Sequence, residues 1–204
     1  MEIRSKASLA VALSKVKPFH KPSAMQEQYD TDSENAAAVI WAAYMQGDVK
    51  GKTIADLGSG TGILGIGCLL LGAGKAYFID SDMDALAAAQ ENAASLGLAQ
   101  RAEFILEYVA AVSLKCDVVV QNPPFGTRKE HADREFLLKA FSVADTIYSM
   151  HKASTDRFVR AMAADHSFEV EQVLPLKLIL RQTQSFHRRR IHRIEANCYR
   201  LRHI

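Results

Sequence analysis

The chain has 204 residues, of which 49% are hydrophobic and 24% are charged, as expected for a globular domain of ordinary size. Its net charge of +2 is unevenly distributed, because residues 1–127 carry 10 basic and 14 acidic side chains, whereas residues 128–204 carry 15 and 9. An excess of positive charge in one part of a chain is typical of proteins that bind a polyanion such as nucleic acid.

The cysteine content argues against a disulfide-rich or zinc-binding protein. Cys68, Cys116 and Cys198 are an odd set without close spacing, which fits a reducing cytoplasm. No apolar run reaches the roughly 18 residues that a membrane span needs, and residues 1–17 lack the apolar core of a signal peptide. We therefore expect a cytoplasmic protein with one domain over 1–204, in which 1–50 form a helical cap and 51–204 the catalytic sheet.

The apolar periodicity predicts alternating helices and strands. Expected helices cover 3–16, 33–46, 63–71, 83–96, 134–144 and 155–164, and expected strands cover 52–57, 75–79, 103–107, 116–121 and 146–151. Residues 168–180 and 191–201 are long and β-rich, which predicts an antiparallel hairpin at the edge of the sheet. The pattern indicates a Rossmann-like α/β fold with a mostly parallel sheet and helices on both faces.

A glycine-rich turn follows the first expected strand, and two cofactors compete for it. Gly60, Gly62 and Gly65 match the spacing of a dinucleotide-binding loop, in which backbone N–H groups receive a pyrophosphate. However, Asp56 ends the strand just before the loop, and its carboxylate would repel a pyrophosphate but attract a cation. S-adenosylmethionine carries an ammonium and a sulfonium and no phosphate, so we prefer it. The residues expected to hold it here are Asp56, Gly58, Gly60, Thr61, Gly62 and Ile63.

Two further positions complete the predicted cofactor site. Asp80 ends the second expected strand about 20 residues after the glycine turn, where an acidic side chain reaches a ribose hydroxyl. Tyr108 and Val109 follow the third strand and are placed to cover an adenine ring. Asp82 and Asp84 are interpreted instead as charges at the N-terminus of the next helix.

The segment Asn122-Pro123-Pro124-Phe125 ends the fourth expected strand and is the predicted catalytic centre. Two prolines cannot continue a strand and hold the preceding residue extended, so Asn122 is presented rigidly at the carboxyl end of a central strand. Its side-chain oxygen and the proline carbonyls accept hydrogen bonds, and Phe125 supplies a flat apolar face. This arrangement suits a planar substrate that carries an NH2 group.

Basic residues beyond this segment are candidates for contact with RNA. Arg128 and Lys129 lie in a polar loop after Phe125, and a second loop between the two long strands contains an arginine run. Arginines can bind phosphates, and aromatic rings can stack on bases. The candidates in the second loop are Phe186, His187, Arg188, Arg189 and Arg190.

Four stretches together resemble the small ribosomal-RNA adenine-N6 methyltransferases of the methyltransferase-like-five group and their archaeal relatives. They are Glu27-Gln-Tyr-x-Thr31, the glycine loop, Asn122-Pro-Pro-Phe-Gly-Thr127, and Tyr148-Ser-x-His151 with the later Phe186-His-Arg-Arg. The resemblance implies a seven-stranded sheet with a reversed hairpin, and it implies that Gln28, Thr31, Gly58 and Asp80 hold S-adenosylmethionine. It also implies that residues 122–125 hold the target adenine.

The same resemblance implies a partner and shows two departures. Eukaryotic relatives bind a small zinc-containing activator protein. The family usually has an aspartate where this chain has Tyr108, and an apolar residue where it has Gln121.

The sequence thus predicts methylation of an adenosine N6 in structured RNA, most simply small-subunit ribosomal RNA, without a metal. The nearest enzymatic alternative is a protein glutamine-N5 methyltransferase, although that class usually has Tyr at the position of Phe125 and a large extra N-terminal domain. A DNA adenine methyltransferase would need a large recognition domain. A SAM-independent RNA-binding subunit is the alternative from another class.

Overall fold

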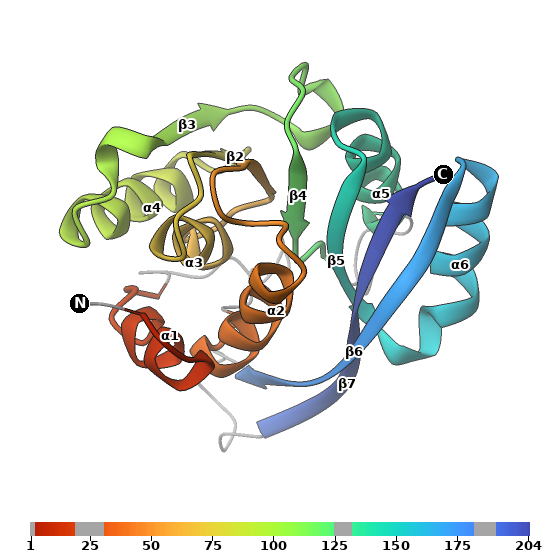
Figure 1. The fold of residues 1–204 in the computed structure, drawn as a ribbon, viewed down its shortest axis with the longest axis horizontal. Helices are drawn as coiled ribbons and strands as arrows, with labels where there is room; N and C mark the ends of the chain where they lie inside the picture. Colours follow the sequence, from red (N-terminus) through yellow and green to blue (C-terminus); the bar gives the residue numbers. More distant parts are fainter. Residues whose placement is uncertain (1–2, 19–30, 125–131, 182–190) are drawn as a thin grey trace, which may run out of the picture.

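A seven-stranded sheet with helices on both faces forms the molecule in the computed structural model, which describes residues 3–18, 31–124, 132–181 and 191–204 (Figure 1). The strand order is β3-β2-β1-β4-β5-β7-β6. Strands β1 to β5 run parallel, and β7 is antiparallel to both β5 and β6. The strands are β1 Thr53–Leu57, β2 Lys75–Asp80, β3 Ala102–Leu106, β4 Val118–Gln121, β5 Thr146–Lys152, β6 Phe168–Arg181 and β7 Ile191–His203.

Six α-helices are described, and they fall into two layers. They are α1 Lys6–Leu13, α2 Ser33–Met45, α3 Ile63–Leu70, α4 Met83–Ser95, α5 Ala132–Val143 and α6 Asp156–Asp165. Buried side chains of α1 to α4 share one hydrophobic core, and those of α5 and α6 share the core on the opposite face of the sheet. This arrangement confirms the predicted fold class. Within the ranges that the structure covers, no helix is long and apolar enough to cross a membrane.

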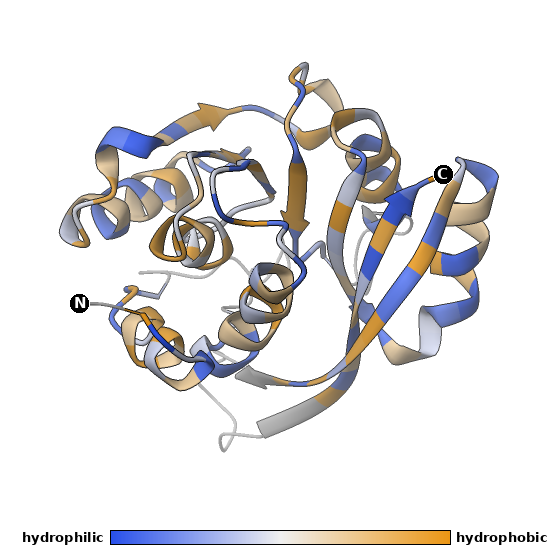
Figure 2. Cartoon of the chain, in the orientation of Figure 1, coloured by the Kyte–Doolittle hydropathy of each residue, from blue (hydrophilic) through white to orange (hydrophobic). Residues whose placement is uncertain are grey.

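The central strand β4 is buried on both faces, because a helix layer packs against each face of the sheet. Val118 and Val120 face the core of α1 to α4, and Val119 faces the core of α5 and α6. The strand is accordingly a continuous apolar band in Figure 2. A strand covered on both sides favours a run of β-branched residues rather than alternation, which is why its short sequence was recognisable.

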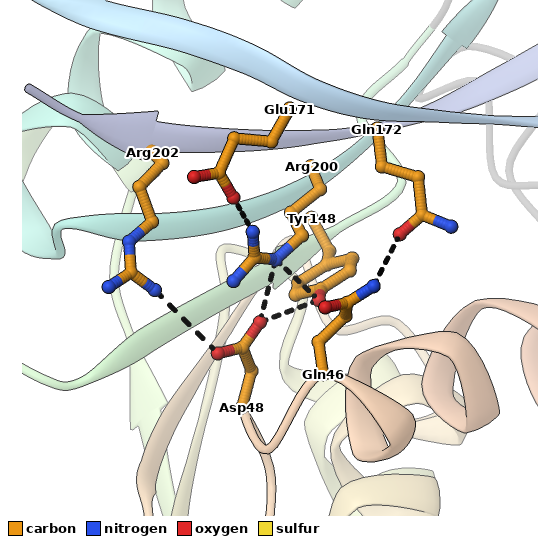
Figure 3. A network of polar contacts seen from close by, with 7 residues as sticks. All are labelled: Gln46, Asp48, Tyr148, Glu171, Gln172, Arg200 and Arg202. Atoms are coloured by element: carbon orange, nitrogen blue, oxygen red, sulfur yellow. Dashed lines mark hydrogen bonds and ion pairs between the residues drawn. The ribbon is translucent and has the colours of Figure 1, made fainter.

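A buried polar network joins the turn before β1 to the terminal hairpin (Figure 3). The Arg200 guanidinium on β7 donates from Nε to Asp48 Oδ2 at 2.8 Å and to the Tyr148 hydroxyl at 3.0 Å. The Tyr148 hydroxyl donates to the same Asp48 oxygen at 2.7 Å, and Glu171 of β6 forms an ion pair with Arg200. Burial and the neighbouring Asp48 carboxylate raise the pKa of the Tyr148 phenol. The network fixes the antiparallel hairpin against the parallel part of the sheet.

Candidate active site

The candidate site lies where the carboxyl ends of β1, β2 and β4 meet. Strand β1 pairs with β2 on one side and with β4 on the other, and all three run parallel. Asp56 therefore lies near the end of β1, Asp80 at the end of β2, and Asn122 directly after β4. Ligands of open α/β sheets bind at this edge.

The loop after β1 requires glycine at its first turn. Gly58 has a φ of 66°, which is in the left-handed region, and a side chain there would put its Cβ 2.7 Å from a ring carbon of Phe136. Gly62 has a φ of 85°, and its Cβ would lie 3.1 Å from both Phe78 and Ala89. The glycines thus let the loop turn tightly between α4 and α5.

The N–H groups of this loop are already taken up by the protein. Gly60 donates to Asp80 Oδ2 at 2.8 Å, and Gly65, at the start of α3, donates to Asp56 Oδ2 at 2.8 Å. Gly62 donates to the Ser59 carbonyl at 2.8 Å. A dinucleotide-binding loop would need these donors for its pyrophosphate. The donors instead hold two carboxylates, so the loop does not have the chemistry of a pyrophosphate site.

Burial makes both of these carboxyl groups costly to ionise in the absence of a positive charge. Asp56 is 1% exposed. Burial raises the pKa of the Asp56 carboxyl to about 8, against the opposing effect of the Gly65 hydrogen bond, and the nearby Asp80 raises it further. Burial also raises the pKa of Asp80. A cation bound near them would relieve their repulsion and stabilise both ionised forms, which fits the ammonium and sulfonium of S-adenosylmethionine.

The remaining predicted cofactor residues lie around this loop. Thr61 is buried, and Ile63 begins α3. Val109 is buried, but Tyr108 beside it is 73% exposed, so its ring presents an open face at the end of β3.

Asn122 is held by a residue distant in the sequence. Its Nδ2 donates to the Thr31 hydroxyl at 2.9 Å. Its Oδ1 is buried and has no hydrogen-bond partner among the described residues. Pro123 is buried beside it and Pro124 is partly buried. Thr31 was predicted as a cofactor residue, and the structure places its hydroxyl on the Asn122 amide nitrogen, which leaves the amide oxygen free to accept a hydrogen bond.

Other predicted site residues lie outside the described ranges. They are Gln28, Phe125, Arg128, Lys129, Phe186, His187, Arg188, Arg189 and Arg190. Their roles stay predictions.

Sequence reasoning missed a buried polar chain behind Asn122. Gln121 Nε2 donates to Ser149 Oγ at 2.8 Å, and Ser149 Oγ lies 2.7 Å from His151 Nε2. Burial lowers the pKa of His151 to about 3, so its imidazole is neutral. Gln121 and Ser149 are register partners on β4 and β5. The available signal was that Ser149 and His151 stand two positions apart in β5, so that both lie on the same face of a buried strand. In the part of the chain that the structure describes, no three His, Cys, Asp or Glu side chains are grouped as metal ligands.

The fold and the acidic glycine loop together define an α/β methyltransferase rather than a dinucleotide-binding enzyme. The sequence matches the Methyltransferase small domain family over residues 29–146. It is 31% identical to the rRNA N(6)-adenosine-methyltransferase METTL5 of Danio rerio, over 89% of this chain and 91% of that protein. It is also 31% identical to Mettl5 of Drosophila melanogaster, which carries the same description, over 92% of each chain.

Among solved structures, the crystal structure of a protein from Pyrococcus horikoshii, provisionally named an RNA methyltransferase, superimposes with a TM-score of 0.92. The two sequences are 38% identical, and the match covers 99% of each chain. This chain therefore belongs to the Methyltransferase small domain family, in the group that contains the METTL5 proteins. It is a methyltransferase, and its cofactor is S-adenosylmethionine.

Proposed function

We propose that this protein methylates N6 of an adenosine in structured RNA, namely RNA of the small ribosomal subunit. The observation that carries the proposal is the Asn122 amide, whose nitrogen is held by Thr31 and whose buried oxygen has no partner among the described residues. A buried acceptor without a partner is costly unless a ligand satisfies it. The two METTL5 relatives named above as rRNA N(6)-adenosine-methyltransferases support RNA adenosine as that ligand.

For the cofactor, we propose that Asp56 and Asp80, at the carboxyl ends of β1 and β2, face the positive charges of S-adenosylmethionine. In this proposal Asp80 binds the ribose hydroxyls, and the buried Asp56 carboxyl, which is ionised when the cation is bound, stabilises that cation. The exposed ring of Tyr108 and the buried Val109 border the adenine. The other proposed cofactor residues are Gln28, Thr31, Gly58, Gly60, Thr61, Gly62 and Ile63.

S-adenosylmethionine supplies a methyl group bound to a positively charged sulfur. We propose that Asn122 Oδ1 and the Pro123 carbonyl accept the two N–H bonds of the adenine amino group, while Phe125 stacks on the ring. Held in this way, the nitrogen lone pair is drawn out of the ring. It forms the new N–C bond as the C–S bond breaks and its electron pair stays on sulfur. The extra proton then leaves to water. Placement of the two reactants contributes most of the rate enhancement.

We propose that the basic second part of the chain holds the RNA. Residues 128–204 carry 15 basic and 9 acidic side chains. The target adenosine must leave its stack to reach Asn122, and this costs a few kcal/mol that backbone contacts elsewhere have to offset. The proposed contacts are Arg128, Lys129, Phe186, His187, Arg188, Arg189 and Arg190. Because ribosomal RNA is the proposed substrate, we propose that the protein acts in the cytoplasm.

A zinc-containing activator protein is the further partner that the resemblance implies, and we propose that it would dock on β3. This strand is at the edge of the sheet, and among the residues that the structure describes it pairs with β2 alone. Leu106 at its end is 56% exposed, and an exposed apolar edge strand is a template for a partner's strand. Leu106→Lys should then abolish complex formation in gel filtration without changing the affinity for S-adenosylmethionine.

The function is tested by incubating the protein with methyl-labelled S-adenosylmethionine and one of three acceptors: small-subunit ribosomal RNA, an equal mass of DNA, or a release-factor protein. We expect label in the RNA alone, recovered as N6-methyladenosine after digestion and mass spectrometry. Asn122→Ala should abolish that label and retain cofactor binding. Label in a glutamine side chain of the protein acceptor would instead assign the alternative glutamine-N5 activity. Ribosomal RNA that stays unlabelled would disprove the proposal.

A further inference from the structure

One buried side chain connects residues 3–18, called here the N-terminal segment, to the glycine loop. Asn92 of α4 is 1% exposed. Its Oδ1 accepts the Lys17 N–H at 2.9 Å, and its Nδ2 donates to the Lys17 carbonyl at 3.1 Å and to the Thr61 carbonyl at 3.0 Å. Both amide hydrogens are therefore used, and every partner is a main-chain group.

The partners of Asn92 are distant in sequence, so the contacts are tertiary. Lys17 is 75 residues away and Thr61 is 31 residues away. Binding the N–H and the C=O of the same residue fixes that residue in position and orientation. Asn92 thus holds the chain at the point where it leaves α1, whatever the side chain at position 17.

The other partner lies in the centre of the cofactor loop. Thr61 stands between Gly60, whose N–H donates to Asp80, and Gly62, where a Cβ would lie 3.1 Å from Ala89 of α4. Ala89 is one turn before Asn92, so α4 leaves no room for a side chain at Gly62 and binds the loop through one hydrogen bond. A shift of Asn92 would move the Thr61 carbonyl and, with it, the two flanking glycines.

The N-terminal segment is also anchored by apolar packing. Helix α1 packs its buried residues Leu9 and Leu13 into the core that α2 and α3 share. The segment is therefore held both by this packing and by the hydrogen bonds of Asn92 to Lys17.

We propose that Asn92 is a positioning residue that couples docking of the N-terminal segment to the shape of the cofactor loop, so that the segment and S-adenosylmethionine stabilise each other. The inference rests on the proposed cofactor role of the glycine loop and does not depend on the RNA substrate. Coupling of this kind is reciprocal, because a ligand that favours the docked loop must favour the docked segment to the same extent.

The first test uses two variants and a matched control. Asn92→Ala removes all three hydrogen bonds, and Asn92→Asp removes both donors while keeping an acceptor. Both should weaken S-adenosylmethionine binding, measured by calorimetry, by about tenfold, which corresponds to one or two net hydrogen bonds. With saturating cofactor, kcat should recover most of its wild-type value, so the change appears in KM. Ser95→Ala, which removes a hydroxyl donating to the Asn92 carbonyl on the same helix, should leave the affinity unchanged.

The second test measures hydrogen exchange, and its main comparison is made on the wild-type protein. Hydrogen exchange of the Lys17 amide and of the amides of α1 should slow when S-adenosylmethionine is added to the wild-type protein, and the same slowing should occur in Ser95→Ala but not in Asn92→Ala. Exchange in α1 that is identical with and without cofactor would overturn the coupling, even if the variants fail to fold. Wild-type affinity in a folded Asn92→Ala protein would overturn it too. A protein that shows the coupling but does not methylate RNA would contradict the proposed substrate alone.

Discussion

At the scale of single residues, Asp56 is an ionisable side chain in an almost fully buried position. Its carboxyl is 1% exposed and has a pKa raised to about 8 by burial, whereas the same group titrates near 3.8 when it is not perturbed. Between these two pH values the folded protein binds more protons than the unfolded chain does. The contribution of Asp56 to stability is therefore greatest at low pH and is lost as pH rises to about 8.

This linkage predicts the behaviour of Asp56→Asn. The amide oxygen can still accept from Gly65 but carries no charge, so the variant should gain stability relative to wild type as pH rises from 5 to 8. The gain should approach at most about 1.4 kcal/mol per pH unit. Urea unfolding at several pH values measures it. A difference between the two proteins that does not change with pH would mean that Asp56 is already ionised at pH 5. Cofactor affinity should fall in the variant at pH 8.

Thr31 offers a second prediction at this scale. Its hydroxyl accepts the Asn122 amide at 2.9 Å, so Thr31→Val should release that amide and lower kcat. The loss should be about tenfold, on the order of one hydrogen bond to a catalytic group. Thr31→Ser keeps the hydroxyl and serves as the control, with activity close to wild type. Steady-state kinetics with saturating cofactor distinguish the outcomes. If the two variants lose activity equally, Thr31 does not act through its hydroxyl.

At the scale of elements, α3 packs so closely on β2 that a glycine is needed. A Cβ at Gly65 would lie 2.5 Å from a ring carbon of Phe78 and 3.2 Å from an Asp56 oxygen. At Gly67, two residues further along the same helix, a Cβ would lie 3.2 Å from the Ile40 side chain, which is a longer distance than at Gly65.

We therefore expect Gly65→Ala to be the more destabilising of two otherwise identical changes. It should cost about 1–3 kcal/mol through overpacking and should weaken cofactor binding by moving Asp56. Gly67→Ala should cost less, because the alanine side chain also favours the helix by about 1 kcal/mol. Thermal unfolding of both variants provides the comparison. Equal losses would show that α3 moves freely away from β2.

At the scale of the whole molecule, the Asp48–Tyr148–Arg200 network holds the hairpin on the sheet. Arg200→Met should leave Asp48 and Tyr148 buried without their cation and cost about 3–5 kcal/mol of unfolding free energy. Arg202, which is 4.0 Å from Asp48 and 47% exposed, provides the control. Arg202→Met should cost less than about 1 kcal/mol. Urea denaturation measures both, and similar values for the two arginines would contradict a structural role of the buried pair.

The charge asymmetry of the molecule predicts how RNA binding responds to salt. If Arg188, Arg189 and Arg190 bind phosphates, replacing all three by alanine should reduce the log–log salt slope by roughly two to three units, at about 0.7 per phosphate on single strands. The affinity for S-adenosylmethionine should not change. RNA-binding curves at several salt concentrations measure the slope, and an unchanged slope would exclude this loop from the RNA-binding surface.

Local patterns were sufficient to predict the elements and the class of the site. The run Val118–Val120, the glycine turn and the two prolines after Asn122 are short-range signals, and the predicted fold, family and cofactor are confirmed. The one-domain organisation and the roles of individual site residues stay predictions. The preference for a cation over a pyrophosphate came from Asp56 alone, and the structure adds that Asp56 and Asp80 occupy loop N–H groups.

The sequence by itself determined where strands and helices alternate along the chain and which side chains stand at the strand ends. Both depend on residues that are neighbours in the sequence. Only the tertiary structure decided which distant groups meet. Thr31 lies 91 residues from Asn122, Lys17 lies 75 from Asn92, and Arg200 lies 152 from Asp48. Such pairs have no local signature, because hydrogen bonds between distant segments depend on how whole layers pack. The main-chain partners of Asn92 follow from that packing and not from any pattern along the chain.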